Sequence, residues 1–126
     1  MKSREGLIRL KRFQVEEKQR QVTQIEAMIA EFDRMAKELN DQVLAEQERS
    51  GIHDAGHFAY PTFAKAATQR RDNLAASERA LKDQLAAAKL ASDEAVAELQ
   101  KVEAIAERDL AHDKHADHKG AAPAHA

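Results

Sequence analysis

Histidine is the residue type in this sequence best suited to chemistry, and most of the histidines fall into two short clusters. The first cluster consists of His53, Asp54 and His57. The second holds three histidines at i, i+3 and i+6 with two aspartates beside them: His112, His115, His118, Asp113 and Asp117. Two histidines at i and i+3 on a helix can share a metal ion, but a structural zinc site closes four ligands on a fixed scaffold. Because these clusters fall on a predicted loop and a predicted tail, we interpret both as solvated polar segments and expect no metal and no cofactor.

Motifs that carry catalysis are missing from the sequence. There is no HExxH pair, no glycine-rich phosphate loop and no GxSxG elbow. The absence of cysteine excludes a thiol nucleophile, a thiolate metal site and a disulfide framework. Carboxylates are spread over predicted helical faces without a concave pocket that could shift their pKa values. We therefore expect the protein not to be an enzyme.

The composition is typical of long helices rather than of a globule with a wide core. Charged residues make up 33% of the chain, aromatics 4%, and the mean hydropathy is −0.67. The formal net charge is −2, so no general basic field attracts nucleic acid. No apolar run approaches the roughly 18 residues of a membrane span, and the opening residues lack the apolar core of a secretion signal. These observations predict a soluble intracellular protein without direct membrane insertion.

An apolar seam with a seven-residue repeat runs along residues 8–43. Such a seam lies on one side of a helix and needs a partner stripe of similar length. Ser3 is a candidate N-cap, and Gly51 suits the left-handed position after the helix, so we predict a helix over about 4–50. The seam is formed by Ile8, Val15, Val22, Ile29, Ala36 and Val43, interleaved with Ile25, Phe32 and Leu39.

A second seam, rich in alanine, lies in the later half of the chain and predicts a helix over about 62–113. The intervening segment, at about 51–61, contains Gly56 and Pro61 and is short, so the two helices should be antiparallel neighbours. The second seam consists of Ala67, Leu74, Leu81, Ala88, Ala95 and Val102, interleaved with Leu85, Ser92, Leu99 and Ala106.

Together the two seams predict an all-α fold, in which two long helices form an antiparallel coiled-coil hairpin over residues 1–113. The register that places Val43 opposite Ala67 satisfies both seams, and so does a register one heptad away. Residues 114–126 lose the seam and contain breakers, so we expect a flexible, disordered histidine-rich tail.

The N-terminal segment departs from this regular pattern. Residues 1–12 carry five basic side chains and one acidic side chain, and basic residues occupy seam positions at Arg4, Lys11 and Lys18. Leu7, Leu10 and Phe13 lie off the seam. Two interpretations stay open: a fraying helix end whose basic side chains cover the seam with their stems, or a docking tip for an acidic or apolar partner.

A second irregular stretch gathers three of the five aromatic residues near two arginines. These residues are Phe58, Tyr60, Phe63, Arg70 and Arg71. They could form a small apolar cap that closes the hairpin or a recognition surface, because aromatic residues and arginine are favoured at the centres of interfaces.

Four stretches of the sequence resemble the family of the flagellar export protein FliJ, in its alphaproteobacterial form. They are MKSREGLIRLKRFQV at 1–15, QIEAMIA at 24–30, FAYP at 58–61 and QRRDNL at 69–74. The likeness covers about residues 1–110. The resemblance implies an antiparallel two-helix coiled coil similar to the stalk of rotary ATPases. It also implies a cytoplasmic protein, peripheral at the inner face of the cell membrane at the flagellar base.

The resemblance further implies a non-enzymatic stalk and coupling component of the flagellar type III protein export apparatus. Its implied partners are the flagellar export ATPase, an export gate membrane protein and export chaperones. By analogy, contact with the ATPase ring is assigned to Arg4, Leu7, Arg9, Leu10, Lys11, Arg12 and Phe13. The surface facing the gate is assigned to Phe58, Tyr60, Phe63, Arg70 and Arg71. Two alternatives are a generic coiled-coil scaffold or chaperone-like binder of export substrates, and a metal-binding protein that uses the tail.

Overall fold

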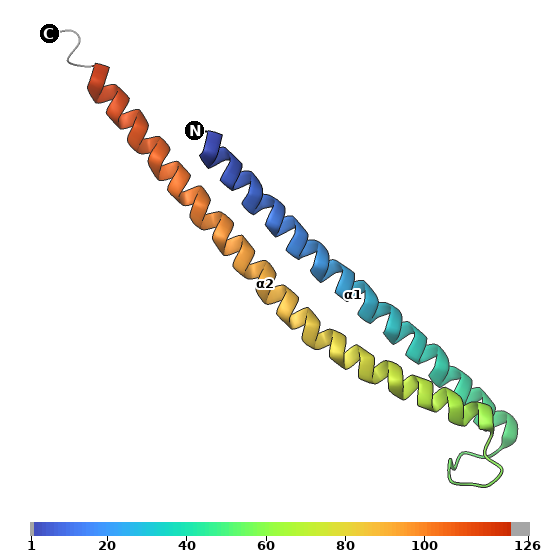
Figure 1. Cartoon of the computed structure of the whole chain (residues 1–126). Helices are drawn as coiled ribbons and strands as arrows, with labels where there is room; N and C mark the ends of the chain where they lie inside the picture. The colour runs from blue at the N-terminus through green and yellow to red at the C-terminus, as the bar shows by residue number, and fades with distance from the viewer. Residues whose placement is uncertain (1, 122–126) are drawn as a thin grey trace. The chain divides into compact units, whose positions relative to one another are not determined.

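The computed structural model describes the backbone of residues 2–121 and the side chains of residues 3–114. Within that range the protein consists of two helices, α1 (Lys2–Ser50) and α2 (Thr62–Ala121), joined by a loop and without any strand (Figure 1). The predicted all-α fold of two long helices packed against each other is confirmed. The chain divides into two units: residues 1–20 with 89–126, here called the terminal unit, and residues 21–88, the loop unit.

The loop unit has the larger set of buried side chains. Val43 and Ala67, which the predicted register places opposite each other, are each 4% exposed, and Ala64 and Leu81 are buried as well. Small alanine side chains on α2 allow the two backbones to approach closely at these positions. The side chain of Asn40 accepts a hydrogen bond of 2.8 Å from Arg71, within one residue of the predicted register. In the loop unit the alternative register, one heptad away, is therefore wrong.

The connection between the helices at 51–61 follows the predicted turn chemistry. Gly51 has a φ of 73° and donates its N–H to the carbonyl of Gln47 at 2.9 Å, which is the left-handed cap expected of a glycine there. At the other end of the loop, the carbonyl of Pro61 accepts the first helical hydrogen bond, from Lys65 at 3.1 Å. Pro61 is thus the N-cap of α2, where its missing N–H costs nothing.

In the terminal unit the two helices are also antiparallel, since Lys11 pairs with Glu98 while Arg4 pairs with Asp109. Its buried hydrophobic side chains among the described residues are Val15 and Ala106. No large side chain in the described part of the protein is fully buried, as expected when only two helices share a seam.

Two helix boundaries differ from the prediction. The first helix begins at Lys2, so Ser3 lies inside it and the N-cap assignment was wrong. The second helix continues past the expected end near 113 to Ala121, because no glycine or proline interrupts α2 before Gly120. The expected flexible tail at 114–126 therefore has a helical backbone up to Ala121, and residues 122–126 lie outside the described residues. Neither helix, over the residues described, contains a stretch long and apolar enough to cross a membrane.

Candidate interaction surfaces

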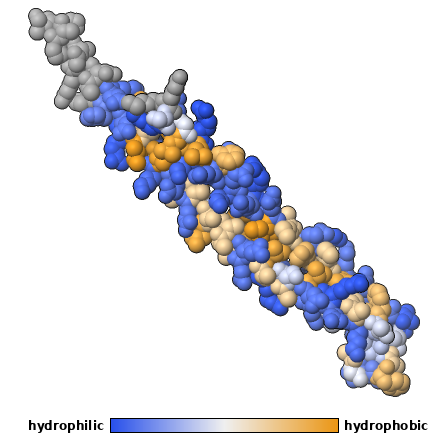
Figure 2. Space-filling view, in the orientation of Figure 1, coloured by the Kyte–Doolittle hydropathy of each residue, from blue (hydrophilic) through white to orange (hydrophobic). Residues whose placement is uncertain are grey.

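The terminal unit presents a row of exposed apolar side chains on α1. Leu7, Leu10 and Phe13 are 43%, 51% and 57% exposed. Their spacing of three residues keeps neighbouring members of the row close on the helix surface while turning them away from the seam. Figure 2 shows a cluster of hydrophobic surface in the terminal unit. Ile105 and Leu110 of α2 add further exposed apolar area to the same unit.

Basic residues of the same segment are turned towards α2. Arg4 is 21% exposed and its guanidinium lies 3.9 Å from Asp109 and 4.0 Å from Asp113. Lys11 is 23% exposed, with its Nζ 3.6 Å from Glu98. Both stems therefore cover the seam while their charged ends reach carboxylates of the other helix. For these residues the geometry matches the first of the two interpretations, in which the stems cover the seam.

The residues predicted to contact an ATPase ring thus separate into two groups. Arg4, Lys11 and Arg12 bridge to α2, the last through a 3.6 Å contact with Glu103. Leu7, Arg9, Leu10 and Phe13 are exposed. Sequence reasoning treated the segment as a basic surface and missed the carboxylates that balance it. Reading across the predicted register would have found Glu98, which is one residue from the position opposite Lys11. The other carboxylates lie three to seven residues beyond the positions opposite Arg4 and Arg12: Glu103, Asp109 and Asp113.

The loop carries a nearly fully exposed aromatic side chain. Phe58 is 96% exposed and stacks on His57 with ring centroids 4.7 Å apart, and Phe63 is 54% exposed. The interpretation of these aromatics as an apolar cap was wrong for Phe58. Tyr60 behaves differently, because its hydroxyl accepts a hydrogen bond of 2.9 Å from the side chain of Gln47 and so ties the loop to α1.

Two of the atoms that a metal could use in the loop accept backbone hydrogen bonds instead. The carboxylate of Asp54 accepts the N–H of Gly56 at 2.9 Å, and Nδ1 of His57 accepts the N–H of Ala59 at 3.0 Å. No group of three or more potential ligands is assembled among the described residues. The side chains of His115 and His118 lie outside the described part of the chain, so the second histidine cluster is not placed.

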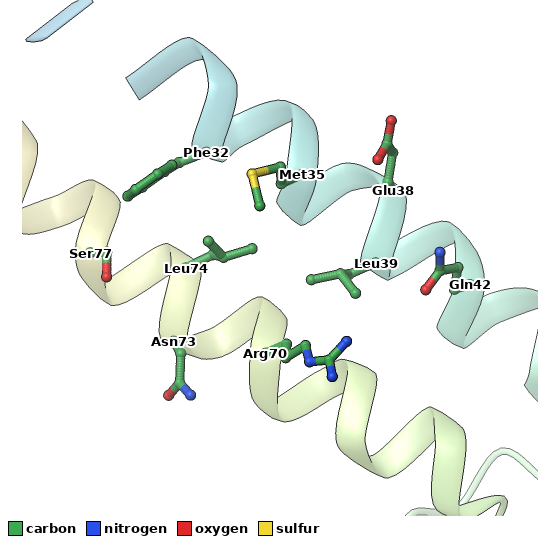
Figure 3. A pocket seen from close by; sticks show the side chains of 9 residues that line it. All are labelled: Phe32, Met35, Glu38, Leu39, Gln42, Arg70, Asn73, Leu74 and Ser77. Atoms are coloured by element: carbon green, nitrogen blue, oxygen red, sulfur yellow. The ribbon is translucent and has the colours of Figure 1, made fainter. Parts of the chain in front are cut away.

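An apolar groove opens between the helices of the loop unit (Figure 3). It has a volume of about 410 Å³, and its apolar walls are Phe32, Met35 and Leu39 of α1 and Leu74 of α2. In Figure 3 these four side chains point towards the space between the two helices. The sequence signal that could have indicated the groove is Met35, which stands one position before the seam residue Ala36.

The two arginines predicted to face the export gate have different environments. Arg71 points to α1, where it donates to Asn40 at 2.8 Å, and it also lies 3.4 Å from Asp72. Arg70 is exposed and lines the groove. The five residues assigned to the gate-facing surface therefore do not form one patch, since Tyr60 and Arg71 contribute to the packing of the loop unit.

The pKa shifts of the described residues belong to surface ion pairs. The guanidinium of Arg34 donates to Glu31 and lowers the pKa of that carboxyl, while Glu31 raises the pKa of Arg34. Glu46 likewise raises the pKa of Arg49 through a hydrogen bond. These shifts stabilise charged forms that are already dominant at neutral pH, so they do not prepare a group for acid–base catalysis.

No protein-family model matches the chain, and neither does any curated protein or solved structure. The resemblance to a family is carried by the four stretches of sequence quoted above.

Proposed function

We propose that the protein is a non-enzymatic stalk and coupling component of a flagellar type III export apparatus. In this proposal it binds the export ATPase ring, links it to the export gate, and escorts export chaperones at the cytoplasmic face of the membrane. The resemblance of four stretches to the FliJ family supports this, and so does the two-helix fold that such a resemblance implies. The single observation that carries it is the exposed apolar row of Leu7, Leu10 and Phe13.

The row has the chemistry of a protein-binding surface. A contiguous apolar strip on a charged helix costs free energy in water, which is recovered when a partner covers it. Ion pairs to α2 balance the neighbouring charges of Arg4, Lys11 and Arg12, so a partner meets apolar side chains without having to neutralise a strongly basic field. Phe13 is the largest member and is the best candidate for an anchor.

The surface assigned to the gate shrinks to three exposed side chains in the loop unit: Phe58, Phe63 and Arg70. Hydrogen bonds order the loop around Phe58, which lowers the conformational entropy lost when a partner receives this ring.

The test is a steady-state ATPase assay with the export ATPase of the same organism, under conditions in which its ring forms. The wild-type protein should raise ATP turnover. Leu10→Asp and Phe13→Asp should each raise the protein concentration needed for half-maximal stimulation by about tenfold or more. Loss of an interface anchor costs at least about 1.4 kcal/mol of binding free energy. Circular dichroism should show unchanged helicity in both variants.

Leu90→Asp is the matched control, because Leu90 is 60% exposed on α2 of the same unit and lies outside the row. It should stimulate the ATPase as the wild type does. Unchanged ATP turnover on addition of the wild-type protein would contradict the proposal. Capture of purified export chaperones or substrates without binding of the ATPase would instead favour the chaperone-like binder.

A further inference from the structure

The groove in the loop unit has charges of opposite sign on its two sides. Glu38 lines it from α1 and Arg70 lines it from α2; in Figure 3 the carboxylate of Glu38 points away from α2 at the edge of the groove. The guanidinium of Arg34 lies 2.6 Å from the carboxylate of Glu38 but also pairs with Glu31. Glu38 therefore shares Arg34 with a second carboxylate, and its side chain is 60% exposed. Arg70 forms no ion pair with any residue in the described range. An acidic side and a basic side therefore flank an apolar floor.

Two helices alone do not cover this floor. Phe32 and Leu39 are only half-buried, and Met28 and Met35 beside them are 47% and 37% exposed. A four-helix bundle solves this problem by placing a second pair of helices on the open flank of the first. Methionine suits such a contact because its flexible thioether adapts to the shape of the surface that it meets.

We propose that a second copy of this chain occupies the groove, so that two loop units pack face to face. A two-fold axis parallel to the helices would lay α1 of each copy on α2 of the other. This symmetry brings Glu38 of one copy next to Arg70 of the second copy, and the same contact repeats across the axis. The groove is thus complementary to itself in charge as well as in its apolar floor.

The pair of charges favours a second copy over an unrelated helix. An acidic helix would be attracted by Arg70 but repelled by Glu38, and a basic helix would meet the reverse arrangement. An occupant must place a positive charge next to Glu38 and a negative charge next to Arg70. A second copy does so with its own Arg70 and Glu38. The inference goes beyond the proposed function. Since the contact covers Arg70, self-association and binding of a gate protein through Arg70 exclude each other.

Sedimentation velocity of the full chain tests the contact over about a thousandfold range of concentration, which covers about three decades of dissociation constant. The wild type should show a reversible monomer–dimer equilibrium. Met35→Glu places a charge on the apolar floor and should raise the dissociation constant by about tenfold or more. Leu44→Glu is the matched control, because Leu44 is 52% exposed on the same helix and does not line the groove. Its dissociation constant should equal that of the wild type.

A charge exchange identifies the pair of residues. Glu38→Lys and Arg70→Glu should each weaken self-association, because each homodimer then contains two contacts between like charges. Mixing the two variants should restore dimers, since the mixed dimer pairs Lys with Glu at one site and Arg70 with Glu38 at the other. A wild type that stays monomeric throughout, or a mixture that associates no better than the single variants, would overturn the proposal. Either of these two outcomes would leave the proposed ATPase stimulation unaffected, because that proposal depends on the terminal unit.

Discussion

In the loop unit, α1 and α2 are held together by four buried side chains and by hydrogen bonds between the elements. The buried residues include Val43 and Leu81, and the hydrogen bonds join Asn40 to Arg71 and Gln47 to Tyr60. In the terminal unit, the same two helices share two buried side chains, Val15 and Ala106, and three basic residues that reach carboxylates. One repeating pattern thus produces two kinds of contact, one dominated by packing and one dominated by charge.

This difference has an energetic consequence. Burying a leucine or valine side chain stabilises a fold by about 1.5–3 kcal/mol, whereas an exposed ion pair contributes about 0–1 kcal/mol and weakens with salt. The terminal unit should therefore open more readily than the loop unit. The apolar row that we assign to a partner lies in the unit with the weaker internal contacts.

Removing the packing at Leu81 should have the largest effect. Leu81 is 7% exposed, so Leu81→Ala should lower the free energy of unfolding by about 2–4 kcal/mol through lost burial and a residual cavity. Urea denaturation followed by circular dichroism measures this change. Leu90→Ala, at a position 60% exposed in the terminal unit, should stay within about 0.5 kcal/mol of the wild type. Equal losses for the two variants would show that the loop unit is not the better-packed region.

The two units should respond in opposite directions to the replacement of glycine by alanine. Gly51 has a φ of 73°, so Gly51→Ala should destabilise the protein by about 1–2 kcal/mol. Gly6 lies inside α1 and an added Cβ would meet nothing within 4 Å, so Gly6→Ala should stabilise the helix by about 0.5–1 kcal/mol. Thermal denaturation measures both changes: the melting temperature should fall for Gly51→Ala and rise for Gly6→Ala. A loss at Gly6 would mean that the N-terminal turns of α1 are constrained by more than helix propensity.

The periodicity of the sequence predicted most of the fold. The two seven-residue repeats follow from spacing, and the short connection follows from the breakers Gly51 and Pro61. Spacing left two registers open, one of which places Val43 opposite Ala67. Helix ends were less predictable, because Ser3 offers a cap that α1 does not use and the stretch before Gly120 contains no breaker. Caps and breaker residues near a helix end have similar free energies, so the sequence does not fix the terminal residue of the helix.

The surfaces were predicted less completely than the fold, for a different reason. Exposure depends on which residues of the other helix lie opposite, and a single-helix pattern does not contain that information. Arg4 and Lys11 were assigned to a partner surface, and their ion pairs with acidic residues of α2 were not anticipated. The groove beside Leu74 was missed because it forms from the gaps between two seams.

Salt should separate the two units by the kind of contact that holds them. At about 1 M salt the screening length falls to about 3 Å, which is shorter than the 3.6–4.0 Å ion pairs of Arg4, Lys11 and Arg12. Hydrogen exchange of the amides at 4–12 should therefore quicken by a few-fold, as expected from three contacts of at most about 1 kcal/mol each. Amides around Val43 provide the internal control and should change much less. Equal acceleration in both regions would remove the distinction between packing and charge.

Acid should reveal a third kind of contact, one that lies within a single helix. Glu31 and Arg34 are both on α1, and their hydrogen bond lowers the pKa of Glu31 from its ordinary value of 4.5. Because the folded protein binds this proton less tightly than the unfolded chain, the pair stabilises α1 fully above pH 4.5 and loses its effect as the pH falls through the lowered pKa. The difference in stability between the wild type and Glu31→Gln should therefore be small at neutral pH and vanish in acid.

The matched control for this titration is Glu26→Gln, because Glu26 is also exposed on α1 in the loop unit and forms no ion pair with a described residue. The carboxyl resonance of Glu31 should titrate below pH 4.5 without a change in the amides that join α1 to α2. Simultaneous loss of the Asn40–Arg71 contact would mean that charge on α1 alone controls the packing between the helices. Charge would then contribute to the contact between the helices in the loop unit as well as in the terminal unit.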